Sequence, residues 1–300
     1  MSGRRWVLLV FLLSPFTFHV SPTLAAINTD VALTPAKRQT ILRTQYSLTR
    51  KGDDPSSENR SMIVHAVKQV VVYGIADATA GFLVVPYLNK DLRTFSGGQR
   101  VSREASGIAD IRLFLKQRIF RKDEPGATTR MALLGGMELP TGEHHGADGI
   151  GRLPAALRLG SGSVDPFAGW VFTHQTQWYE FSQDLTYQVN TGHDDLQFGD
   201  SFGHNTGMWV RVWPRISPEW ESPRALHAVL ELNGIWQAKH RSSGTIKDSG
   251  GYTLFLSPGV QYVTPRWLLE TSVQFPIVEE LNGNELGTDW VVTVGARTTF

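Results

Sequence analysis

Ionised side chains recur at alternate positions in several stretches of this chain that are otherwise apolar. The basic members are Arg112, Lys116, Arg118, Arg130 and Arg211, and the acidic members are Asp110, Glu138, Glu180, Asp184, Glu231 and Glu270. Around an enclosed, water-filled passage, opposed basic and acidic walls orient small polar or aromatic solutes. We expect such a route to be lined by Arg112, Arg118, Arg130, Glu180, Glu231 and Glu270. The alternative is that the charges pair and fill the passage, leaving a structural protein without transport.

A second group has the residue types of a hydrolase. Ser201, His204 and Asn205 follow a polar cluster at 190–195. A nucleophilic hydroxyl must lie within hydrogen-bond reach of an oriented imidazole, and we expect these residues in a glycine-rich loop without an ordered triad. The sequence therefore predicts no catalytic residue and no enzyme, with a lipid hydrolase as the alternative.

Histidines beside carboxylates raise the question of a metal site. Glu143-His144-His145 and His193-Asp194-Asp195 are the two candidate runs. Adjacent side chains of an extended segment point apart and cannot chelate one ion together. We therefore expect no metal and no cofactor, and we assign no role to His144 and His145.

The elements that must position these residues are strands, because period-two alternation dominates the sequence and helical spacing is rare. In 266–278, Trp267, Leu269 and Val273 fall on one face, and Glu270 and Ser272 fall on the other. The same criterion predicts about twelve strands, at 39–49, 65–76, 80–89, 107–121, 128–139, 167–175, 178–190, 206–215, 225–240, 251–263, 266–278 and 288–300.

The connections between these segments alternate between longer and shorter, with short turns at 77–79, 122–127, 176–177 and 264–265. This order predicts an all-β fold, a closed antiparallel up-and-down transmembrane β-barrel of about twelve strands. A water-soluble β-sandwich shows the same alternation with its apolar face inside. Segments long enough to cross a bilayer at a tilt, which takes roughly 9 to 11 residues, favour the barrel.

The amino-terminal segment has the pattern of an export signal. Arg4 and Arg5 precede an unbroken apolar run at 6–13, and Ala25-Ala26 supply small residues for cleavage. We therefore divide the chain into a signal peptide, 1–26, and a single barrel domain, 27–300, in a bacterial outer membrane. Without the two arginines, 27 of the 29 basic residues remain against 28 acidic ones, a formal charge of −1. This balance offers no field for nucleic acid, and the absence of cysteine excludes disulfides and thiolate sites.

Aromatic residues stand near many strand ends, where membrane barrels place interfacial girdles. The candidates are Trp178, Tyr179, Trp213, Trp236, Tyr262, Trp267 and Trp290. The last segment alternates from Trp290 to Phe300, and a terminal aromatic residue resembles the signature that outer-membrane barrels present to their insertion machinery. We therefore expect three kinds of partner, namely membrane lipids, that machinery and a small-molecule solute.

The longest internal loop carries a recognisable motif. Leu139-Pro140-Thr141-Gly142 ends one strand, and Gly160-Ser161-Gly162-Ser163 followed by Asp165-Pro166 leads into the next. This arrangement resembles the outer-membrane transporter family named for the MetA pathway of phenol degradation. The resemblance implies a barrel that passes small solutes, aromatic or hydrophobic ones among them. We expect the loop at 140–166 to narrow the lumen, with an ordinary surface loop as the alternative.

Overall fold

The computed structural model describes residues 26–96, 98–194, 196–215 and 224–300. Most of the predicted signal peptide, residues 1–25, therefore lies outside the described residues. Within the described ranges, no helix has the length and hydropathy to span a bilayer.

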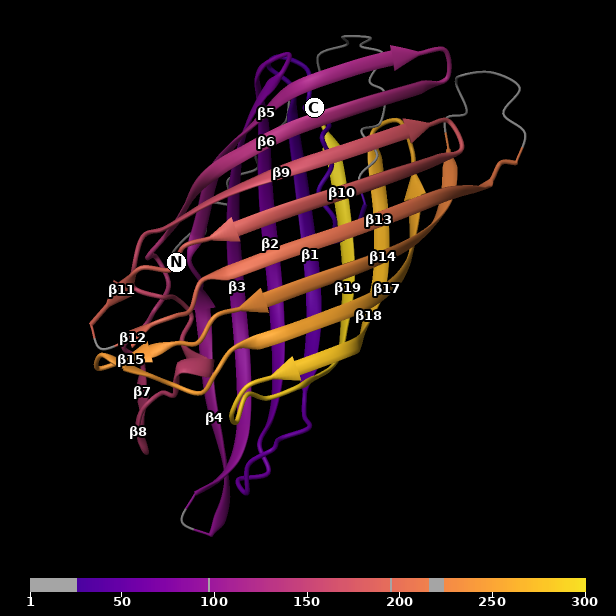
Figure 1. The fold of residues 1–300 in the computed structure, drawn as a ribbon. Coiled ribbons are helices and arrows are strands. Elements are labelled where there is room, and N and C mark those ends of the chain that lie inside the picture. Colours follow the sequence, from indigo (N-terminus) through magenta and orange to yellow (C-terminus); the bar gives the residue numbers. More distant parts are fainter. Residues whose placement is uncertain (1–25, 97, 195, 216–223) are drawn as a thin grey trace, which may run out of the picture.

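One antiparallel sheet closes on itself to form the barrel (Figure 1). Its strands are β1 Thr40–Lys51, β2 Ser61–Ala76, β3 Thr79–Ser96, β4 Gln99–Ile108, β5 Ile111–Glu124, β6 Ala127–Leu139, β9 Asp165–Thr176, β10 Tyr179–Gln188, β13 Ser201–Trp213, β14 Ala225–Gln237, β17 Gly251–Val263, β18 Trp267–Leu281 and β19 Thr288–Thr299. Pairing of β1 with β19 closes the ring. Because β4 and β5 pair with successive parts of β3, they form one interrupted wall strand, and the barrel has twelve strands as predicted.

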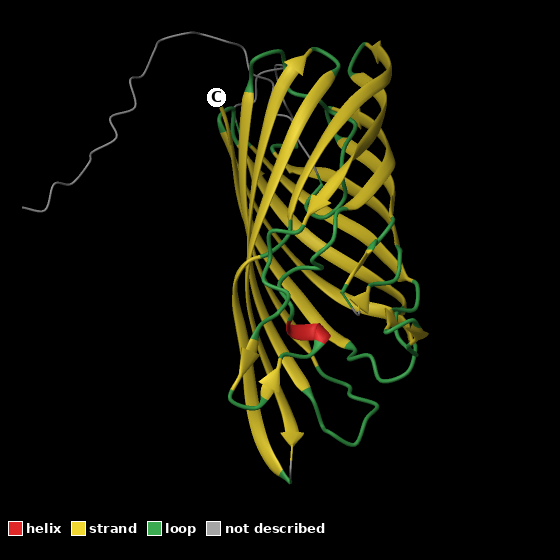
Figure 2. Ribbon diagram, turned by 90° about the vertical axis from the view of Figure 1, so that its left-hand side faces the viewer, coloured by secondary structure: helices red, strands yellow, loops and turns green. Residues whose placement is uncertain are grey.

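Most of the turns follow the predicted alternation, and the connection between β13 and β14, at 214–224, is the exception. Short connections join β2 to β3, β5 to β6, β9 to β10 and β17 to β18, and the C-terminus lies at the same end (Figure 1). The longer loops gather at the opposite end, the long-loop end. There they carry the short strands β7 Ala147–Asp148, β8 Gly151–Arg152, β11 Gly192–His193, β12 Leu196–Gln197, β15 Arg241–Ser242 and β16 Thr245–Ile246, and the three-residue 3₁₀ helix η1 Ala155–Leu157 (Figure 2).

Two predicted boundaries were wrong. The stretch 90–106, expected as a loop, continues β3 and returns as β4, a hairpin that projects at the long-loop end (Figure 1). Residues Ser201 to Asn205, expected in a glycine-rich loop, begin β13. In both stretches polar residues alternate with few aliphatic ones, so the apolar signal of a lipid-facing strand is weak.

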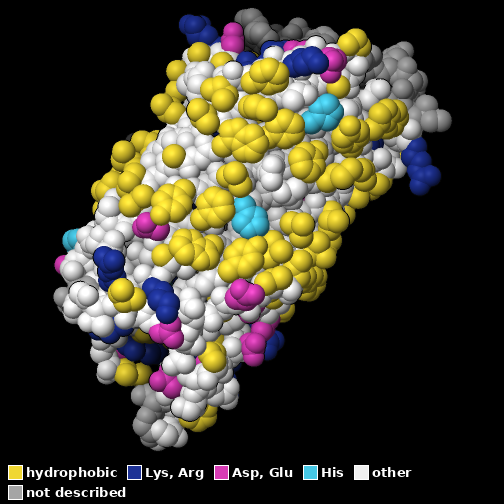
Figure 3. All heavy atoms as spheres, viewed as in Figure 1, with side chains coloured by type: hydrophobic (Ala, Val, Ile, Leu, Met, Phe, Trp, Pro, Cys, Tyr) yellow, Lys and Arg dark blue, Asp and Glu magenta, His cyan; other side chains and the backbone are white. Residues whose placement is uncertain are grey.

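The apolar faces of the strands point outward. On β14, Leu230 is 53 % exposed and Leu232 is 39 % exposed, whereas Glu231 between them is fully buried. A soluble sandwich requires the opposite orientation. Apolar side chains cover the outer surface between two charged ends (Figure 3), so the barrel is built to contact lipid.

Aromatic residues mark both edges of this apolar surface. Trp178 and Trp267 are exposed beside short turns and Trp213 at the same end of the barrel, and Trp236 and Tyr187 are exposed toward the long loops. On β3 the outward residues change from Leu83 and Tyr87 to Asp91 and Arg93, because this hairpin extends beyond the lipid into water. The long-loop half of the hairpin therefore stands outside the membrane.

Candidate functional site

The predicted ionised residues of the wall face the barrel interior. Alternation along each strand places Arg112, Lys116 and Arg118 of β5 and Glu180 and Asp184 of β10 on the inner surface. Arg130, Glu138, Arg211, Glu231 and Glu270 occupy inward positions on β6, β13, β14 and β18, and Asp110 lies between β4 and β5. Several of these groups are hydrogen-bonded to neighbouring side chains. Arg112, for example, donates to Glu138 at 2.5 Å and to Gln188 at 2.7 Å.

A segment before β1 lies inside the barrel, which the sequence did not predict. Residues 26–35, which we call the strap, enter beside the β2–β3 turn, where the Thr34 hydroxyl donates to the carbonyl of Asp77. From there the strap crosses the lumen to β14 and β18. Ile27 and Ala32 are buried in two separate apolar clusters within the barrel. The strap therefore partitions the lumen at this level.

The strap is held by hydrogen bonds from its backbone to the wall. Glu231 accepts from the amides of Asn28, at 3.0 Å to each carboxylate oxygen, and of Thr29 at 2.9 Å. It also accepts from the Asn28 side chain at 2.7 Å. Asp184 accepts from the amide of Asp30 at 2.7 Å, and Thr173 accepts from that of Ala32 at 2.9 Å. Irregular backbone inside a barrel needs such partners, since its amides would otherwise be unsatisfied.

Two cations complete the attachment of the strap. Lys116, which is 1 % exposed, donates to Asp30 at 2.5 Å and to the carbonyl of Val31 at 3.0 Å. Arg43 of β1 donates to the carbonyl of Ile27 at 2.7 Å and pairs with Glu270 at the same distance. Five of the predicted wall residues therefore hold the strap or its anchor: Asp184, Glu231, Lys116 and Arg118 bond the strap directly, and Glu270 bonds Arg43. Part of the inner charge is thus used to hold this segment in place.

Glycines on the wall make room for the strap. A Cβ at Gly207 of β13 would lie 3.2 Å from the Cβ of Thr29, and a Cβ at Gly259 of β17 would lie 2.6 Å from Ile27 Cδ1. A side chain at Gly259 would therefore displace Ile27, whereas one at Gly207 would require the strap to move by only a few tenths of an ångström. Inward glycines on β13 and β17, the two strands that flank β14, were the sequence signal that could have indicated a segment packed inside the barrel.

The motif of the longest loop is organised by two aspartates. Asp110 accepts from the amides of Gly142 at 2.9 Å and Ser161 at 2.6 Å, so one carboxylate joins the two ends of the loop. Asp165 accepts from the hydroxyl of Ser163 at 2.9 Å and from the amide of Thr191 at 2.7 Å, which links this loop to the next one. Asp110, predicted as a wall charge, therefore anchors a loop.

Between these anchors the loop packs against the inner side of the neighbouring strands. Leu157 of η1 is fully buried against Met62 of β2 and Leu92 of β3, and Lys90 donates to the carbonyls of Ala156 and Arg158. Figure 2 shows η1, in red, beside these long strands. Apolar packing and hydrogen bonds thus hold the loop at the long-loop end of the barrel.

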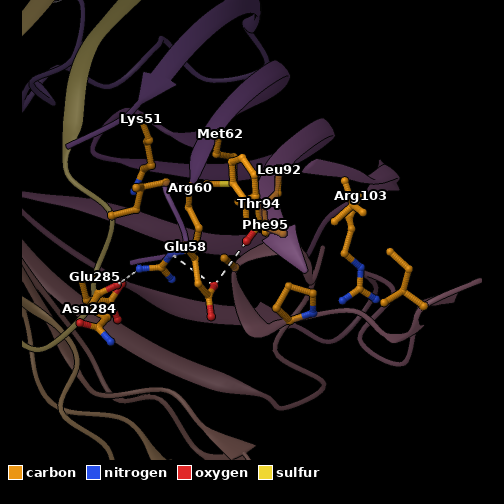
Figure 4. A pocket seen from close by; sticks show the side chains of 15 residues that line it. Lys51, Glu58, Arg60, Met62, Leu92, Thr94, Phe95, Arg103, Asn284 and Glu285 are labelled. Carbon is orange, nitrogen blue, oxygen red and sulfur yellow. Dashed lines mark hydrogen bonds and ion pairs between the residues drawn. The ribbon is translucent and has the colours of Figure 1, made fainter. Parts of the chain in front are cut away.

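A cavity of about 310 Å³ opens beside this packed loop (Figure 4). Its apolar lining includes Met62, Leu92, Val101, Ile150 and Leu286, and its charged lining includes Lys51, Glu58, Arg60, Arg103 and Glu285. The β1–β2 loop forms one side of the cavity. Asp54 of that loop accepts from the guanidinium of Arg60 at 2.7 Å. Burial alone would raise the pKa of Asp54, but the hydrogen bonds from Arg60 and Ser56 outweigh it and lower that pKa well below its usual range.

The candidate hydrolase residues do not assemble into a dyad. Ser201 and His204 are three residues apart on β13, so their side chains leave opposite faces of the sheet. The imidazole of His204 bonds the hydroxyl of Tyr252 at 2.9 Å, and Asn205 donates inward to Asp184 at 2.8 Å.

Comparison with known proteins identifies relatives of this barrel. Residues 61–280 match the family described as "Putative MetA-pathway of phenol degradation". An outer membrane channel from Pseudomonas putida F1 superposes with a TM-score of 0.66 at 13% identity, over 90% of this chain and 98% of that one. The monoaromatic hydrocarbon channel CymD matches at a TM-score of 0.43 and 9% identity, over 89% and 90% of the two chains. The outer membrane phospholipase A of Escherichia coli matches at 0.39 and 14%, over 85% and 89%. No curated protein matches the sequence.

Proposed function

Because the chain belongs to the MetA-pathway of phenol degradation family, we propose that it is a passive channel for small solutes in a bacterial outer membrane. The observation that carries the proposal is the polarity of the barrel, which has an apolar surface outside and a hydrogen-bonding lumen inside. Such a wall faces lipid on one side and solute on the other. The fold shared with the Pseudomonas putida F1 channel supports this assignment.

The solute class we propose is a small molecule with an aromatic or hydrophobic body. The cavity at the long-loop end combines Met62 and Leu92 with Arg60 and Arg103, so it suits a molecule that is apolar at one side and polar at the other. Its position beside the anchored loop makes it a first binding site on the way into the lumen. The loop at 140–166 is the proposed constriction at that end.

The strap is the proposed second constriction. If the signal peptide is cleaved after Ala26, the strap has a free end within the lumen and can withdraw without breaking a covalent bond. Its hydrogen bonds to Glu231, Asp184 and Thr173 then set the fraction of barrels in which the lumen is obstructed. This arrangement is a channel with a displaceable obstruction rather than an enzyme. Phe300 is exposed, and we propose that the insertion machinery recognises it.

Reconstitution of the purified barrel tests the assignment. Proteoliposome swelling is compared for glucose and 4-hydroxybenzoate, whose charge prevents it from crossing lipid unaided, together with conductance in a planar bilayer. We expect faster swelling than in protein-free liposomes, and faster entry of the aromatic solute. Val101→Trp, which fills the cavity, should slow 4-hydroxybenzoate entry several-fold. Ser102→Trp, one residue along β4 and on its opposite face, is the matched control. Swelling equal to that of empty liposomes, with no conductance, would identify a structural barrel instead.

A further inference from the structure

Three imidazoles and a carboxylate meet at the long-loop end, from two loops that are distant in the sequence. His144 and His145 belong to the loop between β6 and β9, and His193 and Asp194 belong to the loop between β10 and β13. One nitrogen or oxygen ligand atom from each residue lies within 4.8 Å of the others. We propose that these four residues form a binding site for a divalent transition-metal ion, with Zn²⁺ as the best-fitting ion.

The contacts within the cluster bring its ligand atoms together. The Nε2 atom of His145 lies 3.1 Å from Asp194 Oδ2, and the Nε2 atom of His193 lies 3.5 Å from Asp194 Oδ1. The rings of His144 and His193 are 4.9 Å apart at 85°, and those of His144 and His145 are 4.1 Å apart. Asp194 thus bridges two imidazoles, and the third imidazole packs against both.

The backbone around the cluster allows the imidazole rings to lie close together. A Cβ at Gly162 would lie 2.8 Å from the ring of His193 and 2.9 Å from that of His144, so only glycine leaves room for both imidazoles. Asp194 has a φ of 50°, in the left-handed region that a non-glycine residue rarely adopts. The two loops are also joined by the hydrogen bond from the Thr191 amide to Asp165. The convergence therefore does not depend on a bound ion.

The donor set selects the class of ion. Imidazole nitrogen and carboxylate oxygen are ligands for zinc and its neighbours, whereas calcium and magnesium prefer oxygen alone. Zinc bonds of about 2.0–2.1 Å place tetrahedral ligands roughly 3.3 Å apart. The present atoms reach this spacing by approaching one another by up to roughly 1.5 Å. The side chains of His145, His193 and Asp194 are 52%, 42% and 40% exposed, so they can move and an ion can reach them from solvent.

Neighbouring positive charge opposes the ion, and Arg152 makes the direct contact. Arg152 donates from its guanidinium to Nδ1 of His145 at 3.1 Å, which places a positive charge beside the cluster and occupies one imidazole nitrogen. A divalent cation must displace this guanidinium or bind beside it, and either requirement lowers the affinity of the site for the cation. Removing the charge should therefore strengthen metal binding, a direction that a purely structural role for the histidines would not give.

An occupied site would join two loops at the long-loop end of the barrel. The His193 loop is also paired with the next loop, because β11, β12, β15 and β16 form one small sheet. A metal ion would therefore connect the loop that carries the Gly-Ser-Gly-Ser motif to this sheet.

Calorimetric titration of ZnCl₂ into the full barrel, purified without a histidine tag, tests the proposal. We expect one ion per chain in the wild type, with at least tenfold weaker binding in His144→Ala and in His193→Ala. Arg152→Gln should bind severalfold more tightly. His174→Ala, which removes an imidazole from the outer face of β9, is the control and should bind like the wild type.

Limited proteolysis gives a second measurement that does not depend on the heat of binding. Zn²⁺ should slow cleavage in 140–164 for the wild type and leave the rate unchanged for the His144→Ala/His193→Ala double variant. The barrel fold of each variant is checked by its β-sheet circular dichroism. The proposal is overturned if the wild type binds no Zn²⁺ in excess of the double variant, or if Zn²⁺ protects both equally.

Discussion

Weakening the hydrogen bonds between Glu231 and the strap should open the channel. In Glu231→Gln one carboxylate oxygen becomes an amide NH2 group, which donates hydrogen bonds and cannot accept one, and the negative charge that strengthens the remaining bonds is lost. Three donors from Asn28 and Thr29 now end on this carboxylate, at 2.7–3.0 Å. A hydrogen bond to a charged group stabilises by roughly 1.5–3 kcal/mol and a neutral one by roughly 0.5–1.5 kcal/mol.

These values give the size of the effect. A loss of about 1 kcal/mol at two or three contacts totals about 2–3 kcal/mol of strap binding. Since each 1.4 kcal/mol is a factor of ten, the ratio of withdrawn to seated straps should rise roughly 30- to 150-fold. While the seated state predominates, solute flux should rise in the same proportion. Initial swelling rates of proteoliposomes with glucose measure this flux.

A matched substitution separates the strap from a general change of lumen charge. Glu138→Gln makes the same chemical change on the inner face of β6, where the carboxylate pairs with Arg112 and not with the strap. It should leave the swelling rate within about twofold of the wild type, since its pair is partly exposed. Equal swelling rates for Glu231→Gln and Glu138→Gln would contradict the role assigned to the strap.

A reversible cross-link provides an independent check of the same prediction. The chain has no cysteine, and the Cβ positions of residues 29 and 207 are 3.2 Å apart, slightly under the usual disulfide separation of about 3.5–4.5 Å. The Thr29→Cys/Gly207→Cys protein should swell slowly when oxidised and faster after reduction. If oxidation and reduction give the same rate, the strap does not control flux.

Three further predictions concern the loops and the alternative function. Asp110→Ala removes the acceptor shared by both ends of the 140–166 loop, and should speed amide exchange in that loop by at least tenfold, as hydrogen-exchange mass spectrometry would show. The lowered pKa of Asp54 means that its carboxylate stabilises the β1–β2 loop above the ordinary carboxyl pKa near 4. This contribution disappears as the pH falls through the lowered value. Asp54→Asn removes the carboxylate at pH 7 and should therefore speed amide hydrogen exchange in 52–60. An exchange rate unchanged from the wild type would show that Asp54 does not anchor this loop. Ser201→Ala/His204→Ala should hydrolyse phospholipid no differently from the wild type, at the level of protein-free vesicles, and a loss of measurable activity would restore the hydrolase alternative.

The choice between barrel and sandwich shows where sequence reasoning reached its limit. Leu230, Glu231 and Leu232 alternate in both folds, because alternation states only which residues share a face of the sheet. The export signal, strand length and aromatic strand ends favoured the barrel, and the exposure of Leu230 and Leu232 confirms it. The missed β3–β4 hairpin lies outside the lipid, where a strand needs no apolar face.

The sequence by itself determined most of the strands, which residues share a face of each strand and the end at which most turns lie, because each of these follows from local backbone geometry. Only the tertiary structure decided which face of each strand points inward, and which segments meet inside the barrel and at its long-loop end. The strap reaches Glu231 across a separation of about 200 residues, and His144 meets His193 through two loops of irregular conformation. Such contacts depend on how the sheet closes and how the loops turn, and a period of two residues carries no information about either.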